Sequence, residues 1–220
     1  WKKKYIGKNW YLGETLHAGI GQGYWQTSPL QLCLMMAQIA NGGYKINPRI
    51  ILNENDNKKF SDLEQFIADK ELFSEDVVSL YDFIVKFKYK SLFRNPENIK
   101  FVKDALYGAT NEPMGTSYRS RLSKKEFIFA GKTGTSQVKR FTEKQRELEV
   151  KNEDLPYEDR DHALFVAFAP YHKPRYSISV LVEHGGSGSK SAAPIAKKVL
   201  KKVLEKHPDR ENYRKVFKTI

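Results

Sequence analysis

The apolar and polar positions of the first half of the chain are arranged as in helices. The three helical stretches are residues 28–41, 74–90 and 95–109. In the first stretch, Ser28 is a favoured N-cap residue, and Gln31 completes a capping box with it. The glycines that follow residue 41 supply the left-handed conformation in which helices commonly end. Apolar residues occur all round this helix, so we expect it to be buried on more than one side, with its cysteine and both methionines in the core.

The second half of the chain changes to strand patterns. Residues 127–138, 163–169 and 176–183 have strand composition, and the last of these segments alternates apolar and polar positions. Residues 139–161 are crowded with charges and nearly free of aliphatic residues, so we expect a long solvent-exposed excursion there. A final helix over residues 192–206 should lay one apolar face on the sheet. That face consists of Ile195, Val199, Leu200 and Val203.

The order of these elements predicts the fold class. Helices come first, and an antiparallel meander closed by a helix follows. We therefore expect an α+β fold, in which an antiparallel sheet is flanked by helices. At 220 residues the chain is long enough to bury a substantial core without disulfide or metal staples.

Composition and spacing exclude several classes of protein. A single cysteine, Cys33, excludes an internal disulfide framework and a cysteine-based zinc ribbon. No apolar run approaches the roughly 18 residues of a membrane-spanning helix. The five histidines lack the spacing of a metal site, so we expect no metal and no cofactor. Glycines at 19, 21 and 23 precede a helix, but Tyr24 occupies the last glycine position of a dinucleotide-binding fingerprint, which predicts a tight turn instead.

The charge balance is strongly basic, with 38 Lys and Arg against 26 Asp and Glu, a net charge of +12. The lysines are spread over the whole chain, which is typical of a solvated surface. The sequence has no aromatic RNA-binding signature and no zinc-finger spacing, so we expect no nucleic-acid partner. A non-catalytic basic module, bound to nucleic acid or to an anionic wall polymer, is the alternative from another functional class.

The stretch with the clearest chemical potential is residues 130–136, AGKTGTS. Strand alternation places Lys132 and Gly134 on one face and Thr133 and Thr135 on the other. The glycine leaves space beside the lysine ammonium, where a substrate backbone can lie against the strand. The two hydroxyls can donate to a carboxylate in the positive field of the lysine. Lys132 is therefore our candidate catalytic residue, and Thr133, Gly134 and Thr135 are the candidate substrate-binding residues.

The K-T-G tripeptide alone is also compatible with an ordinary strand that carries a bulge glycine. K-T-G is, however, a signature of penicillin-binding proteins and class A β-lactamases, and further segments of the chain narrow this resemblance. They follow one another in the order GIGQGYW, SPLQL, IANGG, NEPMGT, K-T-G, AFAP and VEHGG. Together they resemble the class B penicillin-binding proteins, and most of all the members that act in cell elongation. The matching segments span residues 10–204.

The resemblance implies the penicillin-binding and serine β-lactamase-like fold and peptidoglycan D,D-transpeptidation. In such a reaction a serine attacks a peptide that ends in D-Ala-D-Ala, and the acyl-enzyme passes its acyl group to an amine on a neighbouring strand. Lys132 would relay protons beside that serine. Thr133 and Thr135 would bind the carboxylate of the substrate or of a β-lactam, and the Thr135 backbone N–H would donate to the oxyanion hole.

The same resemblance implies partners and a location. The partners are the peptidoglycan stem peptide, β-lactam antibiotics and the cell-elongation machinery. The location is the periplasmic face of the bacterial inner membrane, with membrane contact through a segment outside this chain. Alternatives within the superfamily are a serine β-lactamase and a penicillin-sensing receptor domain. The NEPMGT turn and the charged excursion favour the transpeptidase.

Two other motifs of the family, S-x-x-K and S-x-N, should precede residue 19, and the chain begins too late to contain them. S-x-N occurs nowhere, and S-x-x-K occurs at Ser136–Lys139 and Ser187–Lys190. The first pair lies on or just past the predicted strand, where residues three apart point to opposite faces, and the second lies in a glycine-rich turn. We therefore expect an incomplete fold, inactive alone, that is the C-terminal part of one transpeptidase domain. Its parts are a helical region at 1–126, a sheet with the C-terminal helix at 127–206, and a tail at 207–220.

Overall fold

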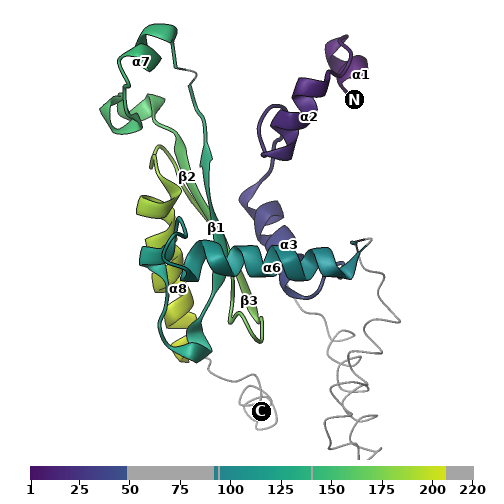
Figure 1. Ribbon diagram of the computed structural model, residues 1–220, viewed down its shortest axis with the longest axis vertical. Coiled ribbons are helices and arrows are strands. Elements are labelled where there is room, and N and C mark those ends of the chain that lie inside the picture. The colour runs from purple at the N-terminus through teal and green to yellow at the C-terminus, as the bar shows by residue number, and fades with distance from the viewer. Residues whose placement is uncertain (49–91, 94, 140, 207–220) are drawn as a thin grey trace, which may run out of the picture.

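The computed structural model describes residues 1–48, 92–93, 95–139 and 141–206 of the chain (Figure 1). The helix expected at 74–90 and the tail expected at 207–220 lie outside the described residues. None of the described helices is long and apolar enough to cross a membrane.

The strands of the described residues form one antiparallel sheet in the order β1-β2-β3. They are β1 (Ala130–Ser136), β2 (His162–Ala169) and β3 (Tyr176–Val182). β1 begins later than the sequence predicts, because residues 125–127 form a short 3-10 turn. The α+β class and the antiparallel sheet are confirmed.

Helices cover both faces of the sheet, which explains why β2 is the most apolar strand. Its residues at positions 163, 165, 167 and 169 pack towards α8 (Ala193–Lys206). Val166 and Phe168 pack on the opposite face, with residues of α3 (Pro29–Ala40) and α6 (Pro96–Asn111). Figure 1 shows α8 on one side of the sheet and α3 with α6 on the other. A strand that is buried on both faces needs a continuous apolar sequence rather than an alternating one.

The start and end of α3 follow the sequence prediction. Gln31 N–H donates to Ser28 Oγ at 3.2 Å, and Ser28 N–H donates to Gln31 Oε1 at 2.8 Å. These two bonds satisfy backbone donors that an uncapped helix leaves free. Gly42 and Gly43 then turn the chain with φ of 93° and 90°.

Replacing Ser28 by Ala should lower the free energy of unfolding by about 1 kcal/mol, because the backbone N–H of Gln31 loses its acceptor. Chemical denaturation of the full-length protein measures this loss. Ser28→Asn is the matched control, since asparagine caps helices as well as serine does and should retain most of the stability. Equal losses in both variants would show that the capping bond is not the cause.

The burial of α3 differs from the prediction. Met36 is 1% exposed, but Met35 and Leu30 are 43% and 64% exposed, and Cys33 is only half-buried. The Cys33 sulfur lies 3.2 Å from Ser177 Oγ of β3. The expectation of a helix buried on several sides with both methionines in the core is therefore wrong for the described residues. The sheet and α6 cover only one side of α3. The buried residues on that side are Met36, Ile39 and Ala40.

The apolar face predicted for the C-terminal helix is also partly wrong. Ile195 and Val199 are each 44% exposed. The face on the sheet instead consists of two alanines and two leucines, and of these only Leu200 belongs to the predicted face; the four are Ala193, Ala196, Leu200 and Leu204. The two alanines let the first turns of α8 approach the sheet closely, so this face, rather than Ile195 and Val199, packs towards β2. The predicted face and the buried face are neighbours on the helix, and only the packing against the sheet decides which of them is buried.

An N-terminal arm precedes α3 and contains two helices that the sequence patterns did not predict. They are α1 (Lys2–Ile6) and α2 (Leu12–Gly19). The arm is held by Lys2, which is 5% exposed, forms an ion pair with Glu14 and donates to Asn9 O at 2.8 Å. The turn predicted after α2 is confirmed, with φ of 76° at Gly21 and 85° at Gly23. Figure 1 shows the arm extending away from the sheet.

The charged excursion between β1 and β2 is more ordered than we expected. It contains α7 (Glu143–Glu147) and two 3-10 turns, at Asn152–Asp154 and Tyr157–Asp159. Most of its side chains are exposed, as predicted, but Leu155 is 7% exposed. Its last residues are hydrogen-bonded to the end of the sheet, which makes it part of the site described next.

Candidate functional site

The candidate site lies along the edge of β1 that does not face β2. The Thr110 hydroxyl of α6 accepts from Gly131 N–H at 3.1 Å and donates to Gly131 O at 3.2 Å. Both backbone groups of Gly131 therefore point away from β2. In an antiparallel pair this direction alternates along the strand, so the backbone N–H and C=O groups of Thr133 and Thr135 point to the same open edge.

Lys132 reaches this open edge from the α6 face of the sheet. It pairs with Val166, which is packed on that face, whereas the Lys132 side chain is exposed. Its Nζ donates to Thr133 O at 2.9 Å and lies 3.5 Å from Thr133 Oγ1. The ammonium thus sits beside the strand edge, accessible to solvent, and not in the packed core.

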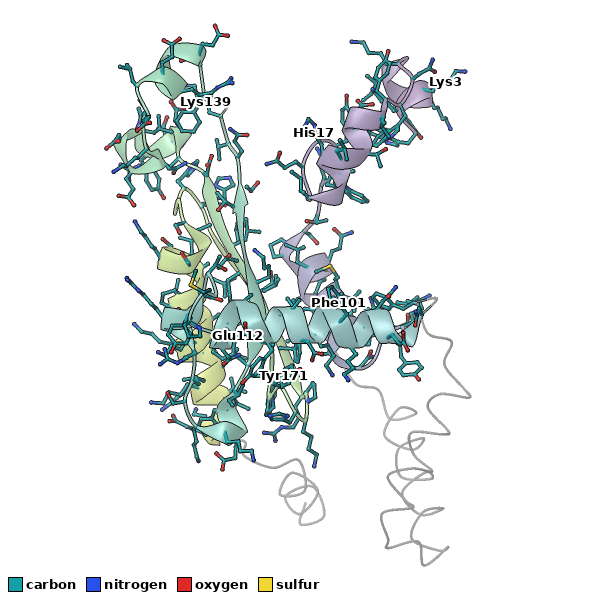
Figure 2. All side chains as sticks on the ribbon, in the orientation of Figure 1. Lys3, His17, Phe101, Glu112, Lys139 and Tyr171 are labelled. Atoms are coloured by element: carbon teal, nitrogen blue, oxygen red, sulfur yellow. The ribbon has the colours of Figure 1, made fainter. Side chains whose placement is uncertain are left out.

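A turn from another part of the chain joins the site at Thr133. The hydroxyls of Thr133 and Thr116 lie 3.2 Å apart. Thr116 ends the NEPMGT segment, which begins at the last residue of α6. Figure 2 shows Glu112, in the same segment, at the end of α6 that meets the sheet. Sequence reasoning had used this segment only for the resemblance, and the structure adds Thr116 to the residues that shape the site.

Gly115 explains why this turn needs a glycine. A Cβ at position 115 would lie 2.5 Å from both Gly108 O and Ala109 O, closer than van der Waals contact allows. The backbone therefore packs directly on the end of α6. Ser117 fixes this arrangement, because its N–H and its hydroxyl both donate to Ala109 O, at 3.0 and 2.9 Å. The tight turn in turn holds Thr116 against β1.

The two glycines of β1 have different surroundings. A Cβ at Gly131 would lie 2.6 Å from Val166 O and 2.7 Å from Phe165 Cζ, so packing alone demands a glycine there. A Cβ at Gly134 would lie 3.4 Å from Leu164 Cβ, which is an ordinary contact. The folded chain therefore does not require the glycine of K-T-G.

Neither S-x-x-K pair forms an activated serine. Lys139 Nζ is bound to Asp159 at 2.6 Å, and Lys190 Nζ is bound to Glu153 at 2.6 Å. Figure 2 shows Lys139 beyond the end of β1, where the excursion begins. In both pairs the lysine points to a carboxylate rather than to the serine three residues before it, which agrees with our rejection of both pairs.

A pair of histidines that the sequence did not connect lies where β2 begins and β3 ends. The rings of His162 and His184 meet edge to face with centroids 4.7 Å apart, and His184 N–H donates to His162 Nδ1 at 2.9 Å. His184 Nδ1 is also 3.0 Å from Arg160 O. The pairing of Ala163 with Val182 puts the two histidines together. The spacing of the histidines in the sequence does not indicate this contact, whereas the register between β2 and β3 does.

The pair joins the excursion to the sheet without forming a metal site. Among the residues that the structure describes, no group of three or more His, Cys, Asp or Glu is placed to hold a metal ion.

These contacts define what the edge of β1 can do chemically. An exposed ammonium and two threonine hydroxyls lie beside the backbone N–H groups of Thr133 and Thr135, which point to the open edge, where an extended chain can pair with them. Such an edge suits a peptide that adds alongside the strand, with its carboxylate received by the lysine and the hydroxyls.

Comparison with known proteins gives consistent matches. The family model described as penicillin binding protein transpeptidase domain matches residues 2–201. The peptidoglycan D,D-transpeptidase MrdA of Salmonella typhimurium is 32% identical over 209 residues, which cover 95% of this chain and 30% of that protein.

Solved structures give the same result. The complex of penicillin-binding protein PBP2 with MreC from Helicobacter pylori has a TM-score of 0.66 and 28% identity, and the match covers 93% of this chain and 30% of that one. Pseudomonas aeruginosa PBP2 in complex with WCK 5153 has a TM-score of 0.61 and 29% identity, with coverage of 93% and 36%. The chain spans about a third of the length of the relatives it matches.

Proposed function

The chain belongs to the penicillin-binding protein transpeptidase domain family, and on this premise we propose that the whole protein is a peptidoglycan D,D-transpeptidase. This chain would supply the C-terminal part of the catalytic domain. One observation carries the proposal: the Lys132 ammonium lies at the open edge of β1 beside Thr133. The contact between Thr133 and Thr116 adds support, because it links K-T-G to a second segment of the family pattern.

In the proposed reaction, a serine supplied from outside these residues attacks the peptide bond between two D-Ala residues. The C–N bond breaks, an ester forms on the serine, and the leaving D-Ala takes a proton. An amine of a second strand then attacks the ester, so that an amide forms and the serine regains its proton. Lys132 would relay these protons and stabilise negative charge.

The threonines would hold the substrate while this happens. Thr133 and Thr135 present hydroxyls that can donate to the terminal carboxylate of the peptide or to that of a β-lactam. The backbone N–H of Thr135 points to the open edge and would donate to the oxyanion, an interaction typically worth about 2.7–4 kcal/mol of transition-state stabilisation. Gly134 would leave room for the substrate backbone beside the strand.

The proposal extends to partners and location. The substrate would be the peptidoglycan stem peptide, and β-lactams would acylate the same serine. A relative from H. pylori was solved with MreC, which supports assembly of the whole protein with cell-elongation components. We place the protein at the periplasmic face of the inner membrane, anchored through a segment outside this chain.

Labelled penicillin tests the proposal directly. The full-length protein should be labelled on a single serine and should release the label slowly, whereas the isolated 220-residue chain should remain unlabelled. Fast release would indicate a β-lactamase instead, because a β-lactamase turns its acyl-enzyme over. Stoichiometric labelling of any serine within these 220 residues would contradict the assigned role of the chain. The full-length protein denatured before labelling is the control for non-specific reaction.

A further inference from the structure

A cleft of about 560 Å³ adjoins the far end of β1. Thr135 forms its boundary with the site described above, whereas Lys132 and Thr133 do not line it. The remaining walls come from the end of the excursion and from the loop that follows β3. The residues that matter for its chemistry are Lys151, Glu153, Arg160, Asp161 and Lys190.

The two acidic groups of the cleft are already engaged. Glu153 is bound to Lys190 at 2.6 Å, and Asp161 Oδ1 accepts from Val138 N–H at 3.1 Å. The hydrogen bond with Lys190 is the main reason that the pKa of Glu153 lies below its usual value, and the charges of Lys151 and Arg160 contribute to the same effect. The cleft thus has more positive than negative side chains, because Lys151, Arg160 and Lys190 face only Glu153 and Asp161.

Arg160 is the cation best placed to act on a ligand. Its side chain is half-buried, and its Nε donates to Leu155 O at 2.9 Å. Across the described segments of the chain, this is the one hydrogen bond of its guanidinium, so both terminal NH₂ groups are left for another acceptor. Two terminal NH₂ groups in one plane match the two oxygens of a carboxylate.

The walls around Arg160 are held in place before any ligand arrives. Arg160 O is in contact with His184 Nδ1 at 3.0 Å. The backbone N–H of Asp161 donates to Asn152 Oδ1 at 3.2 Å. Gly186 N–H donates to Asp161 O at 2.8 Å, and Gly186 has a φ of 70° that few other residues adopt. Together with the bond from Arg160 Nε to Leu155 O, these backbone contacts hold Arg160 in position, so its guanidinium loses little freedom when it binds.

We propose that this cleft binds the terminal carboxylate of the second peptide strand, the strand that supplies the amine, with Arg160 as the principal contact and Lys151 beside it. This inference rests on the proposed function. The donor's terminal D-Ala leaves with its carboxylate when the acyl-enzyme forms, whereas the acyl chain stays on the serine beside β1, so the second peptide needs an anchor next to it. The cleft begins at Thr135, so a peptide anchored there lies next to the acyl group that its amine must approach to about 3–3.5 Å.

The test uses the full-length protein, a peptide donor, and two acceptor peptides that differ only in a free or an amidated C-terminus. With the free acceptor, Arg160→Gln should raise the half-saturating acceptor concentration by about 10- to 100-fold, the usual size of a lost charged hydrogen bond. With the amidated acceptor, the wild-type protein should show a similar weakening and Arg160→Gln no further one. Acylation by labelled penicillin should stay unchanged.

Matched variants separate recognition from folding. Arg146→Gln removes the same charge from the same excursion, outside the cleft lining, and should leave both acceptors unaffected. Arg160→Lys keeps the charge but loses the planar pair of donors, so part of the weakening should remain. Lys151→Met touches no structural contact of Arg160 and should weaken only the free acceptor, by a few-fold.

Two results would overturn the inference: equal weakening of both acceptors by Arg160→Gln, or no change with either. Failure of the proposed function would give a different result, because the wild-type protein would then not be acylated by penicillin at all.

Discussion

Replacing Lys132 by Met in the full-length protein is expected to slow acylation by labelled penicillin by about 10²- to 10⁴-fold, the usual contribution of a positioned proton-transfer group. Methionine keeps the unbranched apolar stem of lysine but removes the ammonium that lies 2.9 Å from Thr133 O at the open edge of β1. The second-order rate constant of acylation, followed by gel fluorescence over time, measures the effect.

Folding should be unaffected by this change. Lys132 is exposed, and its hydrogen bonds in the described structure go only to its chain neighbour Thr133. The thermal midpoint should therefore match that of the unchanged protein. Lys198→Met removes the same charge from the exposed side of α8 and should alter the rate by less than about twofold. If Lys132→Met kept a rate within the same range, Lys132 would not be catalytic.

The second large effect is a contrast between the two glycines of β1. Gly131→Ala should destabilise the fold by about 1–3 kcal/mol, because its Cβ would press on Val166 O, Phe165 and Ala167 at 2.6–2.8 Å. Gly134→Ala should cost far less, because its Cβ meets only Leu164 Cβ at 3.4 Å. Denaturation midpoints of the two full-length variants measure the difference.

Acylation should show the opposite order. Folded Gly134→Ala protein should react with penicillin much more slowly, because the methyl group occupies the space where the ligand backbone lies. Folded Gly131→Ala protein should keep most of its rate, since the backbone of that residue is already occupied by Thr110. Similar stability for both variants, or unimpaired acylation of Gly134→Ala, would remove the basis for assigning Gly134 to substrate binding.

Local patterns predicted the elements where the signal lies within a few residues. The capping box of Ser28 and Gln31, the glycine turn after α3, and the apolar run of β2 all appear as expected. The resemblance to penicillin-binding proteins, built on ordered short segments, is confirmed by the family match over residues 2–201. The roles of Lys132, Thr133, Gly134 and Thr135 stay predictions that the experiments above address.

The errors occur where a helix carries two neighbouring stripes or where partners are distant in sequence. Ile195 and Val199 have the spacing of a helical face, but the neighbouring face carries Ala193 and Ala196, which allow a closer approach to the sheet. Lys2, itself buried, holds the N-terminal arm through an ion pair with Glu14, which no periodic pattern reveals.

By itself, the sequence determined the family, the fold class and the residues of the K-T-G strand, because capping, alternation and short motifs depend on neighbouring residues. Only the tertiary structure decided which face of each helix is buried, that Thr116 meets Thr133, and that Arg160 and the two histidines gather at the end of the sheet. Those contacts depend on strand register and on how closely two backbones approach. Both are set by the packing of the whole fold rather than by any local stretch of residues.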